Sequence, residues 1–284
     1  MTPPLVSWRV SLLLSALAGV VMWFSFPPIA FGPYAAAAVA LLVVAQYRAP
    51  LRRALLCGLV AGVVFFGLLL SWMQVVGMDA WALLACFSAC WIALVGVGTA
   101  LVTRLPGWPV WVASLWVLEE LLRGTVPFGG FPWGHLAFAQ PDTSFGRLAA
   151  VLGQPGVTFA LALLGGSVVA AVLAFQAGRR RRSGVWATVA TALIVLPALI
   201  PLATEGDSEG GPPTAVVAIV QGGTPQSGMG AMDVRRAVLD NHVRATIRLG
   251  TAVSSGSIEQ PDLVLWPENS TDIDPFTQGD AAAL

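Results

Sequence analysis

The sequence predicts a multi-span α-helical membrane bundle followed by a smaller α/β segment. Hydrophobic residues make up 56% of the 284 residues and charged residues only 11%, and the mean hydropathy is +0.77. This composition lies outside the range of soluble domains. The residues up to 203 carry eleven arginines and four acids, a net charge of +7, whereas the remainder carries four arginines and eleven acids, a net charge of −7. We therefore expect the two parts to face different surroundings.

Apolar segments long enough to cross a bilayer recur through the first part. A hydrocarbon core about 30 Å thick needs roughly 20 apolar residues at 1.5 Å per residue. This length test selects segments near 8–26, 29–47, 54–74, 80–103, 108–123, 156–178 and 184–203. We expect residues 1–203 to form a membrane domain of about seven transmembrane helices. Ser25-Phe26-Pro27-Pro28 offers no small-residue cleavage site, which disfavours a signal peptide.

The arginines predict the orientation of the bundle, because short cytoplasmic loops are enriched in basic residues. A cytoplasmic N-terminus leaves Arg147 as the one arginine of a loop on the outer side. The same orientation places the loop 124–155 and everything after Ala203 outside. The inner clusters are Arg9, then Arg48, Arg52 and Arg53, then Arg104, then Arg179 to Arg182.

Charged residues interrupt the apolar pattern at the outer end of the fifth segment. Glu120 and Arg123 stand three residues apart, and Glu119 and Arg123 stand four apart, so either acid can neutralise Arg123 on one helix face. A charge costs a few kcal/mol near mid-bilayer, and pairing reduces that cost. Two interpretations stay open, an ion pair that orients the helix end and a contact with a lipid headgroup.

The outer loop 124–155 combines aromatic residues with helix breakers. Between Gly129 and Gln140, glycine and proline prevent a plain helix, while Phe131, Trp133 and Phe138 suit the headgroup level. An interfacial or re-entrant loop that roofs the bundle is expected. Trp133 is a candidate for lining a lipid access path, or it is an aromatic anchor without a specific ligand. The nearby His135 is interpreted as a satisfied interfacial residue rather than a base.

The cysteines point away from disulfide and metal chemistry. Cys57, Cys86 and Cys90 lie within apolar runs, without a C-x-x-C pair or a Cys/His cluster. Buried, inert thiols are expected. We find no metal, nucleotide or nucleic-acid motif and expect no cofactor. The sequence also contains no lysine.

The pattern changes after residue 203. A polar linker at 204–213 leads to a β-branched run at 214–220, which predicts a buried strand. Residues 232–253 show helical spacing of apolar positions, and 262–266 reads as a second buried strand. The order strand, helix, strand predicts a parallel sheet. A sheet of two strands is too small to be stable alone, so we interpret residues 214–284 as an incomplete domain.

Glu268 follows the second strand directly, in Leu265-Trp266-Pro267-Glu268. Open α/β sheets bind ligands outside the carboxyl ends of their strands. A carboxylate there can act as a general base if its surroundings tune its pKa. A carboxylate that only caps a turn or a following helix is the alternative.

Four motifs in order carry a family resemblance: Trp116 to Glu120 and Arg123, Gly130-Phe-Pro-Trp133, Val220-Gln-Gly222 with Pro225-Gln226, and Leu265-Trp-Pro-Glu268. Together they resemble apolipoprotein N-acyltransferase, a family of bacterial membrane enzymes. The resemblance implies that 214–284 is the start of an extracytoplasmic nitrilase-like (carbon-nitrogen hydrolase) sandwich domain. It also implies a multi-pass protein of the bacterial cell membrane and adds Gln226 as a candidate for substrate or lipid contact.

The resemblance further implies a reaction, the transfer of an acyl chain from a phospholipid to the amino group of a lipoprotein's diacylglyceryl-cysteine. A Glu, Lys and Cys triad carries it through a thioester, and only the Glu has a counterpart here, at Glu268. The three cysteines precede the predicted sheet, and the sequence ends sixteen residues after Glu268. We expect a C-terminally truncated chain. Its partners would be the phospholipid donor and the diacylglyceryl-modified lipoproteins.

Two other functions stay open. A transporter is suggested by the number of spans and by helix glycines such as Gly58, Gly62 and Gly67. Against it, the charges gather at the span ends rather than near the midplane. The second is a noncatalytic membrane scaffold, or anchor, for a polyprenol-phosphate mannosyl synthase. It would become the leading interpretation if the stop at Leu284 were natural.

Overall fold

The computed structural model describes residues 4–201, 214–223, 235–268, 270 and 273. The chain divides into two compact units. The first comprises Met1–Met73 and Asp79–Leu202, and the second comprises Ala203–Leu284 with the short segment Gln74–Met78. The predicted linker at 204–213 lies outside the described residues.

The first unit is a helical membrane bundle with a helix in each of the seven predicted segments. The length and apolar composition of four helical stretches allow a membrane crossing: Leu51–Leu69, Met78–Val102, Ser144–Gln176 and Arg180–Leu199. The number of crossings stays a prediction, because the first two helices are shorter. The helices are α1 (Trp8–Phe24), α2 (Tyr34–Gln46), α3 (Leu51–Leu69), α4 (Met78–Val102), α5 (Trp108–Arg123), α6 (Ala149–Gln176) and α7 (Arg180–Val195). Three 3₁₀ helices lie between them, η1 (Ser71–Val75), η2 (Leu136–Ala139) and η3 (Ser144–Leu148), and a fourth within the described residues, η4 (Leu196–Leu199), follows α7.

Several helix boundaries differ from the prediction: α3 ends at Leu69 rather than near 74, and α7 spans Arg180–Val195 rather than 184–203. The helix α2 begins at Tyr34 rather than near residue 29 because Pro33 precedes its first turn. The helix α6 begins at Ala149 rather than near 156, with a kink at Gly153 (φ 64°) just before Pro155. Proline lacks a backbone N–H and favours such a kink. Apolar patterning alone could not locate these boundaries.

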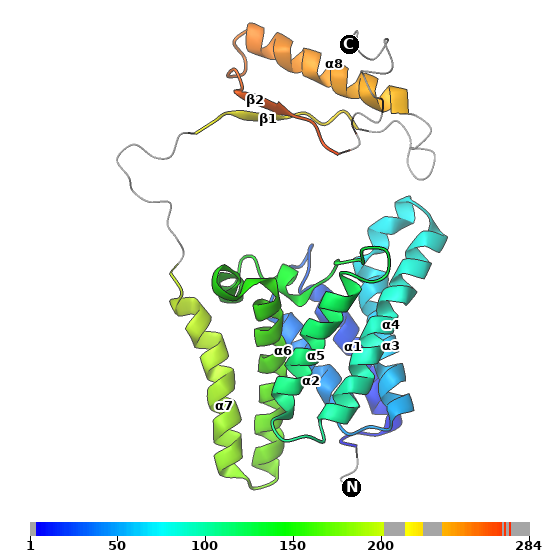
Figure 1. Ribbon diagram of the computed structural model, residues 1–284, viewed down its shortest axis with the longest axis vertical. Coiled ribbons are helices and arrows are strands. Elements are labelled where there is room, and N and C mark those ends of the chain that lie inside the picture. Colours follow the sequence, from blue (N-terminus) through cyan, green and yellow to red (C-terminus); the bar gives the residue numbers. More distant parts are fainter. Residues whose placement is uncertain (1–3, 202–213, 224–234, 269, 271–272, 274–284) are drawn as a thin grey trace. The chain divides into compact units, whose positions relative to one another are not determined.

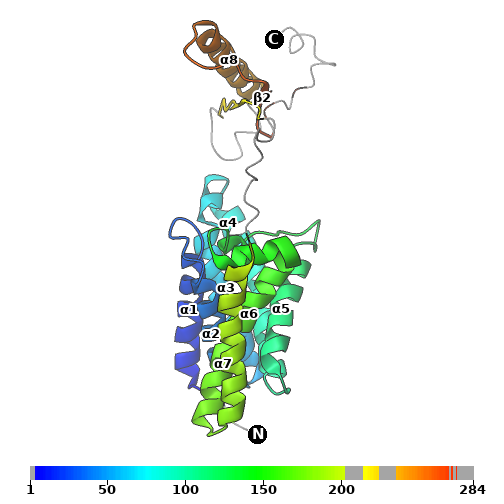
Figure 2. The ribbon, with the colours of Figure 1, turned by 90° about the vertical axis from the view of Figure 1, so that its left-hand side faces the viewer.

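The bundle is organised around α1 and α6. Helix α1 packs against α2 and α3, while α6 packs against α2, α5 and α7 (Figures 1 and 2). The core contains Phe65, Phe66, Val112 and Leu161, all fully or nearly fully buried. Large apolar side chains such as Leu13 on α1 are strongly exposed on the outer face. Such exposure is expected where lipid replaces water as the solvent.

Glycines bring α3 close to α4. A Cβ atom at Gly58 would lie 2.4 Å from the carbonyl oxygen of Ile92, and one at Gly62 would lie 2.7 Å from the Cα atom of Ala89. Small residues four apart permit this close backbone approach between membrane helices. The two glycines therefore serve packing, and the structure gives them no role that would favour a transporter.

Gly58→Ala is expected to destabilise the bundle by about 1–3 kcal/mol, because the added methyl group overpacks the contact with α4. Gly67→Ala is the matched control on the same helix, since its Cβ atom would meet only Trp81, at 4.0 Å. Thermal unfolding of both variants in neutral detergent measures the difference. Equal midpoints for the two variants would contradict the packing role of Gly58.

The prediction that all three cysteines are buried is only partly correct. Cys57 is buried, as predicted, but Cys86 and Cys90 are exposed on α4. Lipid-facing and buried positions of a membrane helix are equally apolar, so the sequence pattern could not separate them. All three thiols are free.

The second unit contains two parallel strands that are connected by one helix. Strand β1 (Val217–Ile219), helix α8 (Arg235–Ser254) and strand β2 (Leu263–Leu265) follow each other in the chain. The register pairs Val217 with Leu263 and Ile219 with Leu265, which confirms the predicted parallel pairing. The predicted burial of the strands is wrong, because these four side chains are exposed. Helix α8 buries Val238, Leu239 and His242.

Candidate functional site

Arg123, the last residue of α5, holds the loop that follows it. Its Nε atom donates to Glu119 Oε1 at 2.5 Å, and its Nη1 atom donates to the carbonyl oxygens of Phe131 at 3.1 Å and Trp133 at 2.5 Å. The side chain is only 1% exposed. The guanidinium also lies 5.1 Å from the centre of the Phe66 ring. One arginine thus joins its own helix, the loop and α3.

Glu120 is the acceptor of a second set of contacts. Its Oε1 atom accepts from the backbone N–H of Leu136 at 2.7 Å, and its Oε2 atom accepts from Gln154 Nε2 and Thr158 Oγ1, both at 2.7 Å. Glu120 is 3% exposed. A carboxylate with three donors is well satisfied away from water. The sequence prediction that Glu119 or Glu120 pairs with Arg123 is therefore resolved in favour of Glu119.

Gln154 and Thr158 were not singled out from the sequence. Two polar residues four apart at the start of an otherwise apolar helix were the available signal, because they share one helix face. Their partner lies 34 and 38 residues earlier in the chain. Gln140 was also missed; it is fully buried and donates through Nε2 to the Gly32 carbonyl at 2.9 Å. These contacts tie the outer loop to α5, α6 and the turn before α2.

The outer loop covers the end of the bundle at which α5 terminates (Figure 1). Its sharp turn needs glycine at residue 130, where φ is 78° and a Cβ atom would lie 2.2 Å from the carbonyl carbon of Gly124. The N–H of Phe131 then donates to the Arg123 carbonyl at 2.7 Å. The loop therefore doubles back onto its own helix end.

Aromatic side chains of this loop face outward. Trp133 is 49% exposed, stacks on Phe131 at 6.2 Å between ring centres and lies 5.6 Å from the Trp72 ring. Phe128 and Phe138 are exposed as well. The backbone of Trp133 is held by Arg123 while its indole remains accessible. This arrangement suits contact with the bilayer interface.

His135 lies beneath the loop surface. It is buried, stacks on Phe138 at 5.0 Å, and its Nδ1 atom lies 3.9 Å from Glu120 Oε2. Burial, and then the nearby positive charge of Arg123, lower the pKa of His135 from 6.5 to about 4. The imidazole is neutral at pH 7.

Protonation of His135 is expected to loosen this loop. Between pH 6.5 and 4 the opened state binds a proton on His135 that the closed state does not bind, so the contribution of His135 to closure weakens as the pH falls. This contribution falls by roughly 2 kcal/mol between pH 7.5 and pH 5, because each pKa unit is worth about 1.4 kcal/mol. His135→Phe removes this contribution and leaves the other titrating groups in place, so the protection of the Leu136 amide against hydrogen exchange should fall about 30-fold further in the wild-type chain than in His135→Phe. Equal pH dependence in the two chains would contradict the role of His135.

Glu268 lies at the carboxyl end of β2 in the second unit. Its side chain is exposed. The preceding Trp266 donates through Nε1 to Thr246 Oγ1 at 2.9 Å, and its ring lies 5.6 Å from that of His242. On the neighbouring strand, the N–H of Val220 donates to the Leu265 carbonyl at 2.9 Å. The segment that leads to Glu268 is thus fixed against α8 and β1.

The structure does not describe every candidate from the sequence. Gln226 lies outside the described residues, and among the residues that are described no group of three His, Cys, Asp or Glu side chains could hold a metal ion. Glu119, Glu120, Arg123 and Trp133 come together in the first unit. Glu268 belongs to the second unit.

Known proteins resemble this chain along most of its length. It is 39% identical to the apolipoprotein N-acyltransferase of Mycolicibacterium smegmatis, over 93% of this chain and 47% of that protein. The protein of the same name from Methylococcus capsulatus is 28% identical over 92% of this chain and 51% of its own length. The chain therefore spans about half the length of these curated relatives. The family model described as the apolipoprotein N-acyltransferase N-terminal domain matches residues 18–167, which include Glu120, Arg123 and Trp133. The chain belongs to the apolipoprotein N-acyltransferase family.

Proposed function

We propose that this chain contributes to apolipoprotein N-acyltransferase activity, the transfer of an acyl chain from a phospholipid to the N-terminal diacylglyceryl-cysteine of lipoproteins. The observation that carries the proposal is the family match over residues 18–167, which covers the helix end and loop where the buried network lies. The helical bundle supplies the membrane setting that a phospholipid donor requires.

In this proposal the second unit begins an extracytoplasmic nitrilase-like domain at 214–284, and Glu268 is its general base. The position of Glu268 after a parallel strand, with an exposed carboxylate, supports that role. The carboxylate would take the proton of a cysteine thiol, and the thiolate would attack the phospholipid ester. A thioester forms, the lysophospholipid leaves with a proton, and the incoming amine then releases the thiol.

Trp133 would line the path of the phospholipid, as its exposed indole beside Phe131 and Trp72 supports. Glu120 and Arg123 would act as positioning residues. Both are buried, and their hydrogen-bond partners are the loop backbone, Glu119, Gln154 and Thr158. A lipid headgroup would therefore meet the loop that they hold rather than their charges.

The orientation of the bundle is part of the proposal. The N-terminus and the clusters Arg48, Arg52 and Arg53, and Arg179 to Arg182, would face the cytoplasm, and the outer loop would face the other side. Residues 1–203 would then form the membrane domain, joined to the extracytoplasmic domain by the linker 204–213.

Neither the described residues nor the comparisons support a mannosyl synthase partner.

A complementation experiment with the intact gene tests the proposal. The reading frame that encodes these residues, as it stands in the genome, is expressed in bacteria depleted of their own N-acyltransferase. Mass spectrometry of a reporter lipoprotein measures the triacylated fraction, and a labelled phospholipid reports the thioester. We expect triacylation to return. A diacylated reporter, with the protein present in the membrane at normal amounts, would overturn the proposed function.

A further inference from the structure

A basic cavity lies at the end of the bundle opposite the outer loop. Its volume is about 920 Å³, and its lining contains five arginines and no acid. The start of α5 borders it, whereas Arg123 ends the same helix, 16 residues long and therefore roughly 24 Å away. The cavity is thus separate from the loop and from the network assigned to acyl transfer. The arginines are Arg48, Arg104, Arg179, Arg181 and Arg182.

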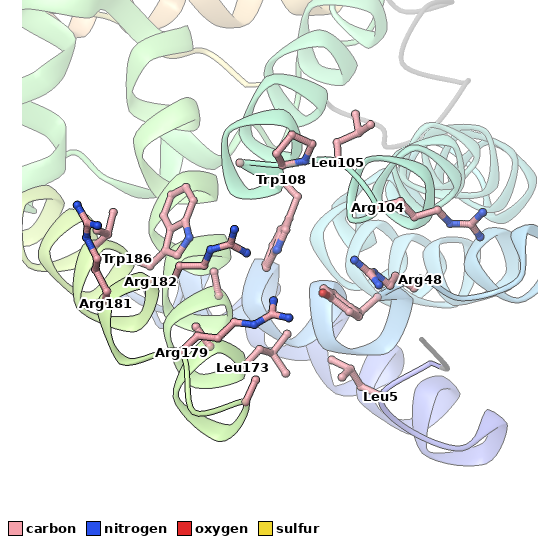
Figure 3. Close-up of a pocket in the computed structure, with 17 residues that line it drawn as sticks. Leu5, Arg48, Arg104, Leu105, Trp108, Leu173, Arg179, Arg181, Arg182 and Trp186 are labelled. Atoms are coloured by element: carbon pink, nitrogen blue, oxygen red, sulfur yellow. The ribbon is translucent and has the colours of Figure 1, made fainter. Parts of the chain in front are cut away.

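Two of the arginines extend toward the middle of the cavity. Figure 3 shows the side chains of Arg179 and Arg182 reaching from the beginning of α7 toward Trp108 and the side on which Arg48 lies. Arg104 and Arg181 lie at its edges. Among the described residues, Arg179 and Arg182 make no ion pair with a carboxylate. Their charges are therefore available to an anion.

Arg48 is held in an unfavourable backbone conformation. Its φ is 51°, in the left-handed region that side chains other than glycine and asparagine rarely adopt. The N–H of Arg48 donates to Thr103 Oγ1 at 3.1 Å, and its Nε atom donates to the Thr103 carbonyl at 3.2 Å. Such strain persists where the surroundings fix it, often at a binding site. The contacts with Thr103 keep this guanidinium beside the cavity.

Two helix N-termini add to the positive potential. Helix α5 begins at the cavity after Gly107, and α7 begins there after Arg179, in both cases without a side-chain hydrogen bond to the first turn. The first N–H groups of a helix carry partial positive charge and bind phosphate readily. Arginine adds bidentate donors that match phosphate oxygens.

Apolar and aromatic side chains complete the wall. Trp108, Trp186 and Leu173 line the same cavity. This end of the bundle is expected to lie at a membrane–water interface. Aromatic residues favour the headgroup level of a bilayer, and basic pockets between membrane helices on the cytoplasmic side bind anionic headgroups. We infer that this cavity binds the phosphate of an anionic phospholipid, with Arg48, Arg179 and Arg182 as ligands and Trp108 beside the glycerol backbone.

Lipid binding by the purified full chain tests the inference. The protein in neutral detergent receives phosphatidylglycerol or phosphatidylcholine with identical acyl chains, and native mass spectrometry measures the bound fraction. Arg179→Gln combined with Arg182→Gln is expected to weaken phosphatidylglycerol binding roughly 30-fold, since each arginine near an anionic lipid contributes about fivefold. Arg180→Gln is the matched control; its guanidinium lies over Phe175 at 5.3 Å rather than in the cavity, and its binding should stay within threefold of wild type.

A second variant separates binding from folding. Arg48→Asn removes the charge while keeping a residue that tolerates the left-handed conformation. It should weaken binding about fivefold, while the loss of the Nε hydrogen bond to the Thr103 carbonyl lowers the unfolding midpoint by only a few degrees. Three results would overturn the inference: equal binding of the two lipids, wild-type binding by the double variant, or inorganic phosphate that binds as tightly as phosphatidylglycerol. The last result would assign the cavity to a free phosphate. Each result is independent of acyl transfer.

Discussion

Glu268→Gln is expected to abolish thioester formation and to lower the rate of acyl transfer at least 100-fold. Glutamine keeps the size of the side chain but cannot accept the thiol proton, and a positioned general base contributes a factor of about 10² to 10⁴. The experiment uses the reading frame that encodes these residues, with a labelled phospholipid to trap the acyl-enzyme. Membrane insertion should be unchanged, because Glu268 is exposed and lies outside the bundle.

Glu259→Gln is the matched control for this prediction. Glu259 is also exposed and lies in the same unit, shortly before β2. Its replacement removes one negative charge without touching the end of the strand, so transfer should remain near wild type. Normal turnover by Glu268→Gln, or an equal loss in both variants, would remove Glu268 from the proposed mechanism. A selective loss would place the base at the carboxyl end of β2.

The main elements could be predicted from sequence because their signals are local. Hydrophobic length located all seven helices of the bundle, and the change to short β-branched runs located β1 and β2. Parallel pairing followed from the strand, helix, strand order, since two consecutive parallel strands need a crossover. The nitrilase-like domain rests on resemblance alone, because two strands do not define a sheet.

The partners within the site could not be predicted, because they depend on how helices distant in sequence meet. The spacing of Glu119, Glu120 and Arg123 allowed two pairings, and the structure distinguishes them through Gln154 and Thr158 on α6. Similarly, the run Arg179 to Arg182 was predicted only as an inner basic cluster ahead of the last apolar segment. Only the arrangement of α5 and α7 shows that Arg179 and Arg182 line a cavity while Arg180 turns to Phe175.

Arg123→Ala should have the largest effect on stability. Removal of the guanidinium leaves Glu119 buried without its partner and frees the carbonyls of Phe131 and Trp133. Breaking a buried pair from one side costs about 3–5 kcal/mol, which should lower the apparent unfolding midpoint in detergent by about 10 °C. Hydrogen exchange at the Phe131 amide should accelerate, because this amide reports the closed loop.

Two further variants decide whether the loss comes from the stranded charge or from the loop. Arg52→Ala removes an exposed arginine of α3 and should change stability by less than about 0.5 kcal/mol. Combining Arg123→Met with Glu119→Gln removes both charges and should recover much of the unfolding midpoint, since an apolar replacement of a buried pair is often tolerated. The carbonyls of the loop would still lack their donor, so the Phe131 amide should stay poorly protected. Recovery of stability without recovery of protection would show that Arg123 positions the loop, whereas recovery of both would reduce its role to neutralising Glu119.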